Sequence, residues 1–84
     1  MHFTYYPQGV CSTKIDLEIE DGIIQQAHFT GGCDGNLKAV CALIQGMPVE
    51  EVRKRLTGIH CGLKSTSCAD QLARGLGQAL EKAQ

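Results

Sequence analysis

The sequence has 84 residues and a formal net charge of -1 at pH 7, so it can form one domain with a modest core and has no basic excess for binding nucleic acid. It is too short for a barrel or a doubly wound sheet. No apolar run reaches the ~18 residues of a membrane span, and the N-terminal MHFTYYPQGV lacks the regions of a signal peptide. Together these features predict a cytoplasmic protein with neither a membrane nor a nucleic-acid partner.

The first third of the chain has the two-residue periodicity of β-strands. We expect a strand over His2 to Tyr6, one from Cys11 to Glu20 and one from about Ile23 to Thr30. In the second of these, one face is apolar and the other carries charged residues. The expected buried face consists of Cys11, Thr13, Ile15, Leu17 and Ile19.

The turn between the two longer strands determines which residues pair. A two-residue Asp-Gly loop would place Ile15 opposite His28, whereas a three-residue loop would place it opposite Ala27. The three-residue loop gives the more apolar face, so it sets the register that we expect. In this register Cys11 lies beside Gly31.

After residue 30 the hydrophobic period becomes helical. We expect a helix with Asp34 as its N-cap, a short helix that begins near Pro48, and a last helix that begins around Ser67 or Cys68. Ser67 with Asp70 resembles a capping box. Strands followed by helices predict a single domain over residues 1–84 with an α+β fold, a three-stranded antiparallel sheet covered on one face by about three helices.

Five cysteines are many for 84 residues, and in a reducing compartment they favour metal ligands, redox thiols or core residues over disulfides. Cys41 lies in the apolar stripe of the first helix and is expected to be a core residue. Cys33 and Cys68 each stand at the start of a helix, where the helix dipole favours a thiolate. The hairpin carries Cys11 towards Cys33, and Cys61 lies in the loop before the last helix.

Cys11, Cys33, Cys61 and Cys68 are therefore predicted to meet at one end of the sheet and to bind a metal, with Lys64 tuning the charge as a cofactor-binding residue. Zinc is expected before an iron–sulfur cluster, because the chain has no clear cluster-binding spacing. Two other functions stay open. One is a thiol–disulfide relay between Cys33 and Cys68, and the other is an interaction domain that binds no metal.

The stretch TSCADQL at residues 66–72 resembles the signature of the TSCPD domain family, named for Thr-Ser-Cys-Pro-Asp, with Ala69 in place of the proline. Further family-like motifs follow the expected order: GVCS at residues 9–12, GGCDGN at 31–36 and GIHCG at 58–62. The family occurs as a C-terminal module of vitamin B12-dependent ribonucleotide reductases and as small free-standing proteins. The resemblance therefore implies a ribonucleotide reductase, or another redox protein, as partner.

The resemblance would also attach the activity of a ribonucleoside-diphosphate reductase to the chain. However, 84 residues leave no room for the radical-generating barrel or the corrinoid site. A metal-stabilised accessory module, or a thiol donor that re-reduces an active-site disulfide, fits the size better. A more distant similarity to NifU-like iron–sulfur scaffold proteins matches Cys33 to the first scaffold cysteine and Cys68 to the last, but the middle cysteine has no counterpart.

Overall fold

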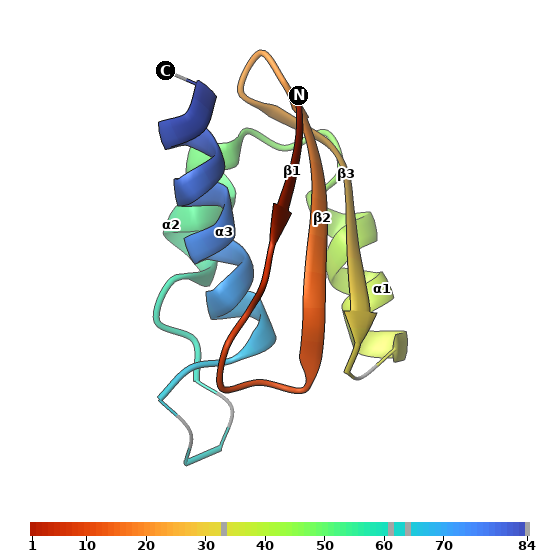
Figure 1. The fold of residues 1–84 in the computed structure, drawn as a ribbon, viewed down its shortest axis with the longest axis vertical. Coiled ribbons are helices and arrows are strands. Elements are labelled where there is room, and N and C mark those ends of the chain that lie inside the picture. The colour runs from red at the N-terminus through yellow and green to blue at the C-terminus, as the bar shows by residue number, and fades with distance from the viewer. Residues whose placement is uncertain (33, 61, 64, 84) are drawn as a thin grey trace.

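The computed structural model describes residues 1–32, 34–60, 62–63 and 65–83, and in these ranges three strands are followed by three helices (Figure 1). β1 (His2–Tyr5), β2 (Ser12–Glu20) and β3 (Ile23–Gly31) form an antiparallel sheet in the order β1-β2-β3. The helices are α1 (Asp34–Ile44), α2 (Val49–Leu56) and α3 (Cys68–Ala83). The predicted α+β fold is confirmed.

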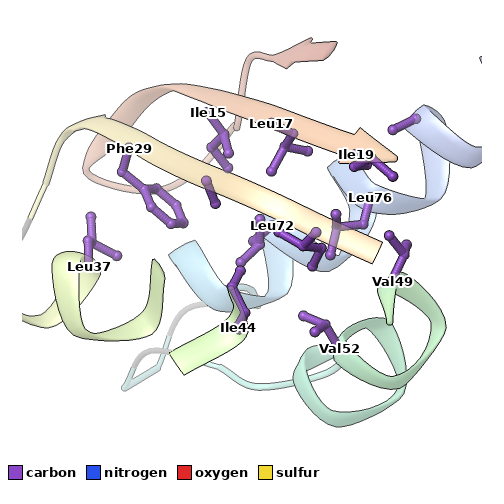
Figure 2. Packing of buried hydrophobic residues seen from close by; sticks show 13 residues of the cluster. Ile15, Leu17, Ile19, Phe29, Leu37, Ile44, Val49, Val52, Leu72 and Leu76 are labelled. Carbon is purple, nitrogen blue, oxygen red and sulfur yellow. The ribbon is translucent and has the colours of Figure 1, made fainter. Parts of the chain in front are cut away.

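One face of the sheet and the three helices enclose the core (Figure 2). Ile15 and Leu17 of β2 and Leu72 and Leu76 of α3 are completely buried in this cluster. Each such side chain contributes about 1.5–3 kcal/mol when it is taken out of water. The core therefore depends on α3 packing against β2. No helix within the described ranges is both long and apolar enough to cross a membrane.

The loop between β2 and β3 has two residues, not the three that we expected. Glu20 pairs with Ile23, so Asp21 and Gly22 alone form the turn. Both have positive φ, 54° and 75°. This is the conformation of a type I′ hairpin turn, whose twist matches that of the strands it joins.

A β-bulge is the second reason why the observed register differs from the expected one. The pairing shifts between Glu18 and Ile19, so that Ile15 lies opposite Phe29 rather than opposite Ala27 or His28. The bulge leaves two successive exposed residues on β3, at positions 25 and 26. It thereby buries apolar residues that the sequence spaces three apart, which a regular strand cannot do.

A further irregularity lies at the start of β2, between Ser12 and Lys14. Ser12, not Cys11, pairs with Gly31. The side chain of Ser12 is buried, whereas Cys11 and Thr13 are exposed. The expected alternation is therefore wrong over these residues, because the local shift inverts which face each side chain occupies.

The helices begin close to the expected residues. Asp34, expected as an N-cap, is the first residue of α1. Pro48 directly precedes α2, in which Val49 and Val52 are almost completely buried. α3 runs antiparallel to β1 (Figure 1), and this arrangement places the start of α3 near the start of β2.

Candidate functional site

The start of α3 is held by a hydrogen-bond network with Asp70 at its centre. The Asp70 side chain is buried, and its carboxylate accepts hydrogen bonds from the Gly58 N–H (2.7 Å) and the Thr66 hydroxyl (2.5 Å). Arg74 lies 3.2 Å from the carboxylate oxygen that Thr66 binds. The hydrogen bond from Gly58, and then that from Thr66, hold the pKa of Asp70 below its usual range. The network thus ties the loop at Gly58 to the helix.

Ser67 caps α3 and binds the same loop. Its hydroxyl accepts a hydrogen bond from the Asp70 N–H at 3.1 Å, as predicted, and donates one to the Ile59 carbonyl at 2.6 Å. The Asp70 carboxylate does not complete a capping box, since Gly58 and Thr66 engage its two oxygens. The hydroxyl and carboxyl groups of this motif therefore have structural roles.

Gln71 connects the start of α3 to the segment after β1. Its side-chain oxygen accepts hydrogen bonds from the Tyr5 hydroxyl (3.2 Å) and the Gln8 N–H (3.1 Å), and its nitrogen donates to the Thr66 hydroxyl (3.1 Å). Gln71 is buried, so these bonds form in a low-dielectric setting where they cannot be replaced easily by water. The N-terminal segment is thereby fixed next to Cys68.

Cys68 is the first residue of α3, and its thiol contacts the start of β2. The Ser12 hydroxyl lies 3.2 Å from the Cys68 sulfur. Ser12 is buried and Cys68 is half-buried, whereas Cys11, directly before Ser12, has an exposed side chain. Two of the predicted metal ligands thus belong to segments that touch each other.

The other predicted site residues are not described. Cys33, Cys61 and Lys64 lie outside the described residues. Among the residues that are described, no three His, Cys, Asp or Glu side chains are grouped to hold a metal ion, and Cys11 and Cys68 are free thiols. The four-cysteine site therefore stays a prediction.

The described residue directly before Cys33 also approaches Ser12. A β-carbon added to Gly32 would lie 3.3 Å from the Ser12 nitrogen and 2.9 Å from a methyl carbon of Leu37. Gly32 also has a φ of 82°, a conformation that glycine adopts without strain. Glycine is thus required at this position, where the chain passes Ser12 of β2 just before it enters α1.

Cys41 lies apart from these residues. It is half-buried and packs against the core from α1, as the sequence predicts. Burial raises the pKa of its thiol, and a backbone hydrogen bond with Phe29 partly opposes this effect. Cys41 is therefore a packing residue and a suitable control for the other cysteines.

A family model described as the TSCPD domain matches residues 3–80. The chain belongs to the TSCPD domain family. No curated protein and no solved structure matches it. In this TSCPD domain the threonine, serine and aspartate of the signature hold the start of α3 by hydrogen bonds, whereas the thiol of Cys68 contacts Ser12. Ala69, in the position of the signature proline, lies in the first turn of α3, where either residue is tolerated.

Two polar residues that belong to this site were not identified from the sequence. The strand alternation places Ser12 on the open face, but Ser12 and Gln71 are 2% and 3% exposed and join the network around Cys68. Each lies within a motif that the sequence analysis did identify: Ser12 ends GVCS at residues 9–12, and Gln71 belongs to TSCADQL at residues 66–72. Their place in those motifs was the available signal.

Proposed function

We propose that this TSCPD domain is a non-catalytic accessory module that binds one metal ion through Cys11, Cys33, Cys61 and Cys68 and associates with a ribonucleotide reductase. The observation that carries the proposal is the 3.2 Å contact between the Ser12 hydroxyl and the Cys68 thiol. This contact joins the start of β2 to the start of α3, the segments that bear the first and last of the four cysteines.

The covalent chain limits how far the remaining thiols can lie from this contact. Gly32, one residue before Cys33, approaches the Ser12 backbone. Ile59, two residues before Cys61, is hydrogen-bonded to the neighbour of Cys68. Two residues span at most about 7 Å, so the positions of Gly32 and Ile59 support the proposal that both thiols can reach this end of the sheet.

Four thiolates suit tetrahedral zinc, with Zn–S distances of about 2.3 Å. Zinc takes precedence over an iron–sulfur cluster because the sequence has no clear cluster-binding spacing. A zinc ion with four thiolates keeps two negative charges, and the ammonium group of Lys64 would offset part of that charge. A closed site of this kind stabilises a small domain and leaves no open coordination position for catalysis.

A thiol–disulfide relay is the second candidate, favoured by the free and half-buried thiol of Cys68 at the first residue of α3. In this function, Cys33 and Cys68 pass two electrons and two protons to a disulfide of the reductase. Their own sulfurs become joined in a disulfide, and the two partner sulfurs become thiols.

Metal analysis of freshly purified protein tests the first proposal. We expect about one zinc per chain, and loss of metal in single Cys→Ser variants at the four proposed ligand positions. Cys41→Ser is the matched control and should keep its metal, because Cys41 packs against the core instead. Cobalt substitution should add thiolate-to-metal absorption bands that the four ligand variants lose.

A protein that is folded, free of metal and unable to take up zinc or cobalt would contradict the metal proposal. Reversible loss of two thiols under mild oxidation, abolished by Cys33→Ser and by Cys68→Ser, would support the relay. Association is measured separately, by titrating the domain into a purified vitamin B12-dependent ribonucleotide reductase. Absence of binding by both the metal-loaded and the metal-free protein would contradict the proposed partner.

A further inference from the structure

β1 is an edge strand whose outer side is unpaired. The N-terminal ammonium group of Met1 donates to the Ile19 carbonyl of β2, and the Met1 carbonyl accepts from the Ile19 N–H. Since this bonding alternates along an antiparallel strand, the backbone groups of His2 and Thr4 face away from the sheet. Within the described part of the chain, no hydrogen bond satisfies these outward groups.

The other edge of the sheet is treated differently. The Ile24 N–H donates to the Met47 carbonyl, and the Ile24 carbonyl accepts from the Gly46 N–H, so the connection between α1 and α2 covers this part of β3. Among the residues that the structure describes, no backbone hydrogen bond covers β1 in this way, and HFTYY at residues 2–6 contains neither the lysine nor the proline that commonly protects an edge. The unprotected edge of β1 is therefore suited to receive another strand.

The residues of this edge are complementary to the same residues in a second copy of the chain. We propose that a second copy of this chain pairs with β1 antiparallel about a two-fold axis at Thr4, which joins the two sheets into one sheet of six strands. In this register Thr4 faces Thr4 of the second copy, Phe3 faces its Tyr5, and His2 faces its Tyr6. Aromatic and threonine pairs are among the favourable cross-strand pairs, and the exposed parts of the half-buried Phe3 and Tyr5 would be covered.

The position of α3 beside β1 determines which parts of the two helices would face each other in the dimer. A hollow of about 350 Å³, whose lining includes Tyr6, Arg74 and Gln78, leaves room beside the strand. Gly75 lies against Tyr5, and a helix rises about 1.5 Å per residue against about 3.3 Å in a strand. The axis at Thr4 therefore passes α3 close to position 77.

The two copies of α3 then run antiparallel across the axis. Arg74 of one copy, whose guanidinium also lies against Asp70 of its own chain, is within about one residue of the level of Glu81 in the other, and both side chains are exposed. Glu81 follows Arg74 by seven residues and so lies on the same side of the helix. Opposite charges thus face each other twice in the dimer, with no like-charged pair at Thr4 to oppose association.

The molar mass in solution tests the dimer, in a comparison of Thr4→Pro with Thr4→Val. The wild type should have twice the 9.1 kDa mass of one chain. Valine keeps the outward N–H and loses only the hydroxyl, which binds Asp16 and the His2 ring of the same chain, so Thr4→Val should remain a dimer. Proline removes that N–H, and each dimer loses two backbone hydrogen bonds, so its dissociation constant should rise by about 10- to 100-fold.

Disulfide trapping provides a measurement that does not depend on the proline variant folding. The two Thr4 residues form a hydrogen-bonded pair in this register, so their Cα atoms would lie about 5.5 Å apart, within the range of a disulfide. Thr4→Cys should therefore form a covalent dimer on mild oxidation. The yield of this dimer should be well above that of wild type and of Gln25→Cys, a control at an exposed position of β3. A wild-type monomer, a dimer that a folded Thr4→Pro variant retains, or cross-linking no faster than the control would overturn the proposal.

Discussion

Asp70 shows how a residue of the family signature can be structural rather than chemical. Its carboxylate is buried among donors from the loop, the residue before the cap and the helix itself. A buried carboxylate without these partners would be costly, so the donors and the acid depend on one another. Asp70 and Thr66 thereby hold the start of α3, where Cys68 lies.

The residue-scale prediction concerns Asp70→Asn. The amide cannot accept both hydrogen bonds, so we expect the free energy of unfolding at pH 7 to fall by about 1.5–3 kcal/mol. The folded-state pKa of Asp70 lies below its ordinary value of 3.8. The contribution of the carboxylate is therefore complete above pH 3.8 and is lost as the pH falls through the folded-state pKa.

Denaturant titrations at pH 7 and at successively lower pH measure this difference. The gap between wild type and Asp70→Asn should narrow as the solution becomes acidic. Asp21→Asn is the control, because Asp21 is exposed in a turn and its change should stay within about 0.5 kcal/mol. A gap that is constant with pH would show that the carboxylate charge is not what stabilises the loop.

At the scale of elements, the contact between α3 and β1 depends on one glycine. A β-carbon at Gly75 would lie 2.9 Å from the ring of Tyr5 and 3.1 Å from the β-carbon of Tyr5. A β-carbon at Gly77 would meet only the end of the Arg53 side chain, at 3.2 Å. The first neighbour is packed against the core, whereas the second can move.

Gly75→Ala and Gly77→Ala form a matched pair. Alanine favours a helix by about 1 kcal/mol over glycine at either position. At Gly75 the overlap with Tyr5 should outweigh this gain and destabilise the domain by about 1–3 kcal/mol. At Gly77 the gain should remain, so that the unfolding temperature rises or is unchanged. Equal effects of the two substitutions would show that α3 does not pack closely on β1.

At the scale of the whole molecule, a metal bound by the proposed ligands would link β2, the entry to α1, the loop before α3 and α3 itself. Free zinc at 100 times its dissociation constant should raise the free energy of unfolding by about 2.7 kcal/mol, since the unfolded chain has no preformed site. Thermal unfolding with zinc and with a chelator measures this difference. Cys68→Ser should abolish it and Cys41→Ser should retain it; a chelator without effect on the wild type would count against a resident metal.

Much of the fold could be predicted because local patterns determine it. The apolar residues of β2 repeat every second position and those of α3 follow helical spacing, so Leu17 and Leu76 could be placed in the core before their contacts were known. The motifs around Cys11 and Cys68 likewise indicated two segments that touch each other in the fold, through Ser12 and Cys68. These signals depend on residues that are close together along the chain, and the sequence alone lists all of them.

The remaining features were decided only by the tertiary structure. The bulge in β3 and the shift at Ser12 arise because two strands and the helices beneath them must bury their apolar residues at once. Burial of Gln71 depends on two hydrogen-bond donors that lie far away in sequence, the Tyr5 hydroxyl and the Gln8 N–H. The sequence by itself thus determined the elements and the order of the cysteines, whereas packing between distant segments decided which polar side chains surround Cys68.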